Sequence, residues 1–276
     1  MVGLLLRRVS NAQKKHLRTL WAMPYRRLDY LDALRGLAIV WMTAYHLCFD
    51  LNHFGYLQQD FYADPFWTWQ RTAIVTLFLF TAGLGQSLAV DRHQTWARFW
   101  RRWFQVAGAA LLVSAGSYAM YPESFIYFGV LHGLAVMLVI VRLTAGWGRW
   151  LWLLGSAAVA LKFMASGTHA LWPGLDFLNH KTLNWLGLVS RKPVTEDYVP
   201  LFPWLGVVWW GMAAGNWLLR TRPQWLAPQA RSALPAISML AGLGRWSLSY
   251  YLLHQPVLLG FLMELSALKQ GQQFLP

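Results

Sequence analysis

The chain has 276 residues, 57% of them hydrophobic and 13% charged, and it contains 18 tryptophans. This composition differs from that of an average soluble domain and excludes a chain whose surface meets only water. With their weakly polar flanks, five apolar runs approach the roughly 20 residues that cross the hydrocarbon core of a bilayer. We therefore expect an all-α, polytopic transmembrane helix bundle. The runs are residues 37–47, 74–84, 106–113, 130–141 and 151–160.

The net charge of +13 indicates membrane orientation and no nucleic-acid partner, because the basic residues cluster in particular connections. The largest cluster lies in an N-terminal segment, residues 1–31, which the positive-inside rule places in the cytoplasm. Part of this segment is expected to form an amphipathic helix on anionic lipid. Residues 32–276 then form the transmembrane domain, and no cleavable signal peptide is predicted. The basic residues of the segment are Arg7, Arg8, Lys14, Lys15, Arg18, Arg26 and Arg27.

About seven spans are expected from the N-terminus onward. Basic residues precede the first span and recur after the second, fourth and sixth, whereas the connection 52–70 contains no Lys or Arg. The connections therefore alternate between the cytoplasm and the outside. The spans are expected near residues 33–51, 71–90, 104–121, 125–143, 150–164, 201–219 and 244–265.

Three segments need separate interpretation. Residues 165–200 form the longest external segment and are expected to hold a short lid or a substrate-contacting helix. Pro256 should kink or break the last span. Residues 235–243 have a second interpretation as an interfacial or partial segment, which would change the number of spans.

The single cysteine, Cys48, excludes an internal disulfide framework and a multi-cysteine metal site. We expect its thiol to fill apolar space. Other metal ligands near it are few and lack the spacing of a metal site, so no metal is expected.

The first span carries ionisable groups at both ends. Arg35 lies at its inner end and His46 follows eleven residues later, about 16 Å along a helix. His46 and Asp50 are spaced i, i+4, so a carboxylate could orient the imidazole and stabilise its protonated form. A buried, hydrogen-bonded structural histidine is the commoner interpretation for an apolar helix taken alone. Asn52 and His53 follow closely, and ionisable groups in a membrane are costly, so we favour a general base at His46.

Several motifs resemble those of the bacterial members of the heparan-alpha-glucosaminide N-acetyltransferase catalytic-domain family, within the wider transmembrane acyltransferases. Together they extend over almost the whole chain beyond the basic N-terminal segment. The motifs are Asp32-Ala-Leu-Arg35-Gly36 and residues 46–51, 78–83, 128–132, 201–206 and 243–257.

The resemblance implies transfer of an acyl group, usually acetyl, from cytoplasmic acyl coenzyme A to a glycan or sugar acceptor outside the membrane. The enzyme would be an O- or N-acyltransferase of the bacterial inner membrane, and its oligomeric state is left open. Four arginines on the inner side could bind the coenzyme A phosphates, since guanidinium groups pair with phosphate in a fixed fork. For the last three, anchoring of the topology is an equal alternative. These residues are Arg35, Arg98, Arg101 and Arg102.

His46 would deprotonate the acceptor or carry the acyl group itself, and the sequence does not separate these routes. The animal enzyme of the family has its essential histidine in the external loop after the first span, whereas the related acyltransferase family three has one at the end of the span. His46 matches the second pattern. His53 is the loop histidine available for the first.

Five further residues are candidates for the substrate cavity, and the first is Asn52, just after the first span. His132 and His254 lie inside predicted spans and either line the cavity with His46 or are structural. Trp67 and Trp69 flank the proposed site and are the aromatic residues most suited to contact a sugar.

Two other functions remain open at this stage. A proton-coupled small-molecule transporter would use His46, Asp50, His132 and His254 as a relay. The absence of an evident internal repeat disfavours transporters built from inverted repeats. A non-catalytic membrane scaffold ranks last.

Overall fold

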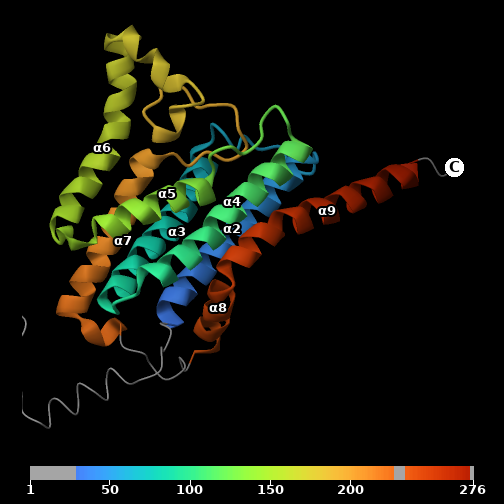
Figure 1. The fold of residues 1–276 in the computed structure, drawn as a ribbon. Helices are drawn as coiled ribbons and strands as arrows, with labels where there is room; N and C mark the ends of the chain where they lie inside the picture. The colour runs from blue at the N-terminus through green and yellow to red at the C-terminus, as the bar shows by residue number, and fades with distance from the viewer. Residues whose placement is uncertain (1–28, 227–233, 274–276) are drawn as a thin grey trace, which may run out of the picture.

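The computed structural model describes residues 29–226 and 234–273, which are mostly helical and contain no strand (Figure 1). Most of the basic segment predicted at residues 1–31 lies outside the described residues. Short 3-10 turns occur at Ala145–Trp147, Pro173–Asn179, Asn184–Leu186 and Pro223–Leu226. The α-helices are α2 (Asp29–His53), α3 (Pro65–Asp91), α4 (Trp96–Met120), α5 (Val130–Leu143), α6 (Trp150–Leu171), α7 (Leu201–Thr221), α8 (Pro235–Arg245) and α9 (Ser247–Gln273).

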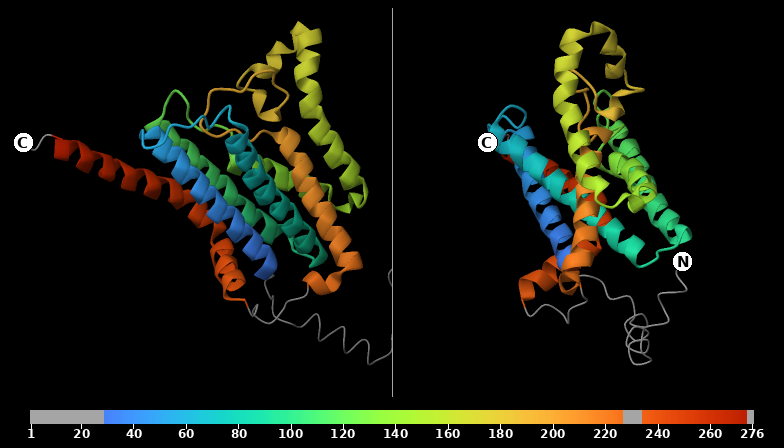
Figure 2. Two further views of the ribbon diagram at one scale, coloured as in Figure 1. Left: turned by 180° about the vertical axis from the view of Figure 1, so that it is seen from behind. Right: turned by 90° about the vertical axis from the view of Figure 1, so that its left-hand side faces the viewer.

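The helices form a membrane bundle, which confirms the predicted fold class. Among the described residues, α3, α4, the Trp150–His169 part of α6 and the Ser247–Leu268 part of α9 are long and apolar enough to cross a bilayer. Helix α5 is a shorter apolar helix, and α2 and α7 have 25 and 21 residues. The basic connections α3–α4 and α5–α6 meet the end of α7 at one end of the bundle (Figures 1 and 2). We call this end the inner end and the opposite one the outer end.

Several helix boundaries differ from the sequence predictions. Helix α3 begins at Pro65 and not near residue 71, because the Asp64 side chain accepts a hydrogen bond from the Phe66 N–H at 2.8 Å and Pro65 suits the first helical turn. Helix α5 begins at Val130 and not near residue 125. The residues before it pair with the external segment through the bonds Glu196 N–H to Ser124 O and Val199 N–H to Phe128 O.

The last span is also different. The chain leaves helical geometry at Trp246, so that the predicted span 244–265 is divided between α8 and α9. Helix α9 then continues through Pro256, where a kink or a break was expected. A proline removes one helical donor, and a membrane helix tolerates this loss. From its start beside α2, α9 leans away from the bundle toward its C-terminal end (Figures 1 and 2).

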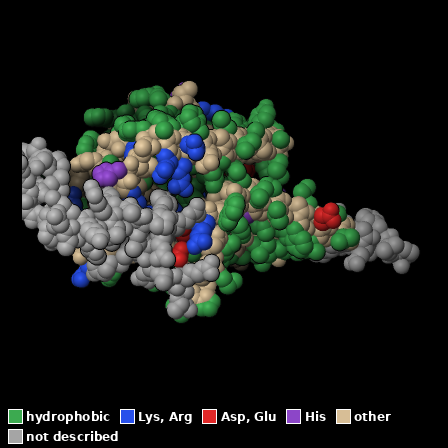
Figure 3. Space-filling view, turned by 60° about the horizontal axis from the view of Figure 1, so that its bottom comes forward, with side chains coloured by type: hydrophobic (Ala, Val, Ile, Leu, Met, Phe, Trp, Pro, Cys, Tyr) green, Lys and Arg blue, Asp and Glu red, His purple; other side chains and the backbone are tan. Residues whose placement is uncertain are grey.

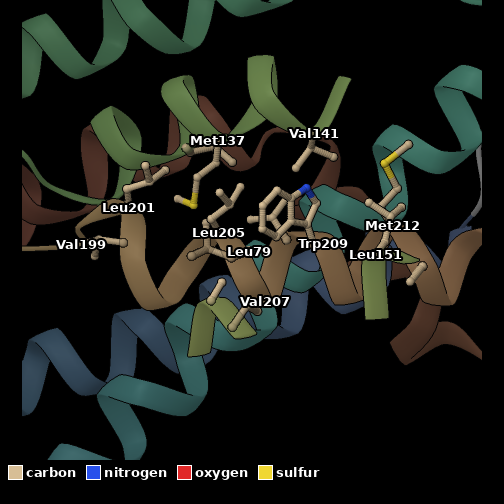
Figure 4. Close-up of a cluster of buried hydrophobic side chains, with 14 of the residues drawn as sticks. Leu79, Met137, Val141, Leu151, Val199, Leu201, Leu205, Val207, Trp209 and Met212 are labelled. Carbon is tan, nitrogen blue, oxygen red and sulfur yellow. The ribbon is translucent and has the colours of Figure 1, made fainter. Parts of the chain in front are cut away.

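The main hydrophobic core surrounds α7, which packs against α3, α5 and α6. Leu79 of α3, Met137 of α5 and Met212 of α7 are fully buried there (Figure 4). Trp209 brings a polar indole N–H into this cluster, and its Nε1 donates a hydrogen bond to Thr144 Oγ1 at 3.0 Å. The core fixes the helices on one side of the bundle, and α2, α8 and α9 complete the other side.

Two glycines allow α8 to cross α2 at backbone contact. A Cβ atom at Gly36 would lie 2.0 Å from the Leu240 carbonyl oxygen, and one at Gly244 would lie 1.7 Å from the Asp32 carbonyl oxygen. Small residues at helix crossings permit this approach. Arg245 of α8 also pairs with Asp29 of α2 at 2.7 Å. Residues 235–243 are therefore a short helix bound to the inner end of α2.

We expect Gly244→Ala to destabilise the protein by about 1–3 kcal/mol, the usual cost of overpacking, because the obstructing atom is backbone. Gly242→Ala is the matched control in the same helix, since a Cβ there meets nothing within 4 Å. The control should be neutral or slightly stabilising. Thermal unfolding midpoints in detergent would measure both, and equal midpoints for the two variants would contradict the close crossing.

Candidate active site

Two imidazoles face each other between α2 and α9. The ring centroids of His46 and His254 are 5.2 Å apart, with an interplanar angle of 63°. The Tyr250 ring stacks on His254 at 6.1 Å, and its hydroxyl lies 3.0 Å from Thr43 Oγ1 of α2. The sequence placed His46 and His254 as separate candidates, and the structure brings them together across 208 positions of the chain.

The tautomer of His254 is set by its own helix. Its Nδ1 atom lies 2.8 Å from the Tyr251 carbonyl oxygen, which can only accept, so Nδ1 carries the proton. The other nitrogen, Nε2, then has a free lone pair. It is buried and has no hydrogen-bond partner within residues 29–226 and 234–273. A buried imidazole with an unused lone pair is suited to accept a proton from a bound substrate.

Asp50 has a different partner from the one expected. Its two carboxylate oxygens lie 2.8 and 3.0 Å from Gln255 Nε2, the donor on α9, and Asp50 is 2% exposed. In the described part of the chain, no hydrogen bond joins it to His46. Since Gln255 follows His254 directly, Asp50 fixes the turn of α9 that carries the second imidazole. Its geometry is that of a positioning residue.

The remaining histidine candidates have other surroundings. His132 accepts a hydrogen bond at Nδ1 from the Gly129 N–H at 3.3 Å, so its Nε2 donates to Ser114 Oγ at 3.0 Å. The Nδ1 atom thus caps the start of α5, and the Nε2 atom joins α5 to α4. His53 is exposed at the end of α2 and its ring contacts Phe54. The structure does not bring either residue into contact with the imidazole pair.

The outer aromatic candidates differ in exposure. The Trp67 ring stacks on Phe61 at 4.1 Å, and its Nε1 donates to Gln59 Oε1 at 3.4 Å. Trp69 is 74% exposed. Asn52 accepts the Gln59 N–H at 2.7 Å and so shapes the loop after α2. Trp67 is therefore occupied by packing, whereas Trp69 is free to face lipid or solvent.

The arginines proposed for the donor lie at the inner end. Arg35 pairs with Asp32 at 3.0 Å and reaches α3, where a Cβ at Gly85 would lie 2.5 Å from its Nη2. Arg98, Arg101 and Arg102 are exposed on the first turns of α4. Lys and Arg side chains are visible on this side of the molecule (Figure 3). The cations and the imidazole pair thus occupy different levels of the same bundle.

Asp197 of the external segment is a site residue that sequence reasoning missed. Its Oδ2 accepts the Val130 N–H at 2.8 Å, at the start of α5, and its carboxylate interacts electrostatically with the Tyr251 side chain of α9. Burial raises the pKa of Asp197, although the Val130 N–H and two nearby cations oppose this shift. No local pattern marks the residue, because its partners are distant in sequence.

The fold and the site define a class of protein, a polytopic membrane protein with two contacting imidazoles between helices of its bundle. The family model of the heparan-alpha-glucosaminide N-acetyltransferase catalytic domain matches residues 27–256, so the chain belongs to this family. It is therefore a membrane acetyltransferase in kind, which confirms the resemblance seen in the motifs. No curated protein and no solved structure gave a significant match.

We expect Asp197→Ala to destabilise the protein by about 1–3 kcal/mol, because it leaves the buried Val130 N–H without its acceptor. Asp197→Asn should be milder, because the amide oxygen can still accept from the N–H. Thermal unfolding in detergent would compare them with Glu123→Ala, which removes an exposed carboxylate of the turn after α4. If Asp197→Ala and Glu123→Ala unfold at the same temperature, Asp197 does not hold the start of α5.

Proposed function

We propose that the protein transfers an acyl group, in the first place acetyl, from cytoplasmic acyl coenzyme A to a glycan or sugar acceptor outside the bacterial inner membrane. The family supports a membrane acetyltransferase and gives no support to the transporter alternative. The observation that supports this chemistry most directly is the facing pair of His46 and His254, in which one nitrogen is buried and unpartnered.

In the proposed reaction the imidazole pair removes the acceptor proton. The oxygen or nitrogen of the acceptor attacks the thioester carbonyl carbon, and its proton passes to an imidazole nitrogen. The new acyl bond forms as the carbon–sulfur bond breaks, and the departing coenzyme A thiolate takes up the proton. His254 has the nitrogen best prepared for this role, and His46 either shares the proton or carries the acyl group in a first transfer step.

Asp50 and the aromatic neighbours would set the geometry of this step. Through Gln255, the carboxylate holds the turn that carries His254. Tyr250 stacks on the imidazole and is itself positioned by Thr43. A base held by packing and by secondary hydrogen bonds keeps its orientation while substrates enter, and this lowers the cost of reaching the reactive arrangement.

The donor would approach from the inner end. Arg35 and the exposed arginines of α4 could bind the phosphates of coenzyme A, since charge-assisted pairs with phosphate are strong and directional. Arg35 lies eleven residues before His46 on the same helix, about 16 Å along its axis. The extended pantetheine arm would carry the thioester from the phosphates into the bundle.

We expect His46→Ala and His254→Ala each to lower kcat for acetyl transfer by about 10²–10⁴-fold, the usual contribution of a positioned acid or base. His180→Ala removes an exposed histidine of the external segment and should leave kcat unchanged. Release of coenzyme A thiol by purified protein, with a panel of sugar acceptors, is the measurement. Full activity in either site variant would remove that residue from the chemistry.

We expect the triple substitution Arg98→Gln, Arg101→Gln and Arg102→Gln to raise KM for acetyl coenzyme A by about tenfold or more through lost phosphate contacts. The matched control is Arg149→Gln, Arg220→Gln and Arg222→Gln, which removes the same charge at the inner end. Acetyl pantetheine, which lacks the phosphates, should not distinguish wild type from either triple variant. An equal rise of KM in both variants would indicate a role in topology only.

A further inference from the structure

One buried histidine takes no part in the proposed reaction. His169 lies in the last turn of α6 and is 9% exposed. The end of α6 and the external segment that follows it rise beyond the outer ends of α3 and α7 (Figure 1). His169 is therefore a buried titratable group on the outer side of the bundle, at the start of the segment for which the sequence predicts a lid.

The tautomer of His169 follows from its partner. Its Nε2 atom lies 3.0 Å from the Leu188 carbonyl oxygen, which can only accept, so Nε2 carries the proton. In the neutral ring, Nδ1 then has a lone pair and no proton. Nδ1 is buried and has no hydrogen-bond partner in the part of the chain that the structure describes. The neutral ring thus leaves one buried nitrogen unsatisfied, which costs free energy.

This nitrogen lies near a carboxylate. Asp176 Oδ1, in the short helix Pro173–Asn179, is 3.9 Å from His169 Nδ1, which is beyond hydrogen-bond distance. Two acceptors without a proton between them repel each other, and the gap is consistent with this repulsion. A second proton on the ring would make Nδ1 a donor. An approach of about 1 Å would then form a charge-assisted hydrogen bond.

The carboxylate is itself connected to the rest of the external segment. Asn179 Nδ2 donates to Asp176 Oδ1 at 3.3 Å, and Asn179 Oδ1 accepts the Ser190 N–H at 3.0 Å. Leu188, whose carbonyl accepts from His169, lies two residues before Ser190. A bond from His169 to Asp176 would therefore complete a set of contacts that joins α6, the short helix and residues 188–190.

The other ionisable side chains of this region form no ion pair or hydrogen bond with His169 within residues 29–226 and 234–273. Lys181 and Lys192 lie over aromatic rings of other segments. On α6, Lys162 is exposed and precedes His169 by seven residues, about 10 Å along the axis. Asp176 is thus the charged group that a proton on His169 would engage. The other ionisable residues are Lys162, His180, Lys181, Arg191 and Lys192.

We propose that His169 and Asp176 form a pH-sensitive latch of the external segment, open when His169 is neutral and closed by a hydrogen bond when it is protonated. Histidine is the side chain that normally changes its charge between about pH 5 and 8. The protonated ring gains a partner, so the stabilisation is present at acid pH and is lost as the pH rises and the ring loses its proton. The latch does not depend on the proposed acyl transfer.

Hydrogen–deuterium exchange of the full chain in nanodiscs, at about pH 5.5 and about pH 7.5, tests the latch on both sides of the usual histidine titration. After correction for intrinsic exchange rates, peptides from residues 172–190 should be about three- to tenfold better protected at the acid pH. The side chain of Asp176 is 72% exposed, and solvent therefore keeps the effect at this modest size.

Two variants should abolish the difference in protection. Asp176→Asn removes the negative charge at an exposed position, and His169→Gln removes the titration while an amide N–H can still donate to the Leu188 carbonyl. His180→Gln is the matched control, since it removes an exposed histidine of the same segment. The control should retain the full difference between the two pH values.

Equal protection of the wild type at both pH values would overturn the latch, as would a difference that persists in Asp176→Asn. Loss of the difference in His180→Gln would assign the titration to another histidine and would also overturn it. Unfolding midpoints at neutral pH would show that the variants are folded. If His169→Gln does not fold, Asp176→Asn decides the outcome alone. Acyl coenzyme A is absent throughout, so failure of the latch and failure of the proposed function are separate results.

Discussion

The hydrogen bond between the Asp50 carboxylate and the Gln255 side chain is the contact on which the geometry of the candidate site depends. It joins the outer part of α2 to α9 at the turn that carries His254. Burying a carboxylate is costly unless its oxygens are satisfied, so separation of the two helices at this point is unfavourable. The same contact therefore keeps the imidazoles of His46 and His254 facing each other.

The external segment contributes to the same arrangement from the other side. Asp197 accepts from the first turn of α5 and interacts electrostatically with Tyr251, three residues before His254. The residues around it pair with the stretch before α5 through Glu196 and Val199. A segment tied at these points is part of the scaffold of the site.

The sequence predicted what local information determines. The hydrophobic runs and the basic connections predicted a helical bundle, and they placed Arg35 near one end and His46 toward the other end of one helix. It did not predict the partners of these groups, because Gln255, His254 and Asp197 come from distant parts of the chain. His46 and Asp50 do lie four residues apart on α2, but the Asp50 carboxylate accepts its hydrogen bond from Gln255 of α9. The break at Trp246 was not predicted either; it lies two residues after Gly244, where α8 crosses α2 at backbone contact.

Helix α2 is the element that these contacts share. Its inner end packs against α8 through backbone contact at Gly36 and Gly244 and through the ion pair of Arg245 with Asp29. Its outer end is joined to α9 by Asp50. In the proposed reaction, two substrates arrive from opposite sides of a membrane. A helix fixed at both ends holds the inner guanidinium and the outer imidazole at a constant separation, so the substrates and not the helix would have to move.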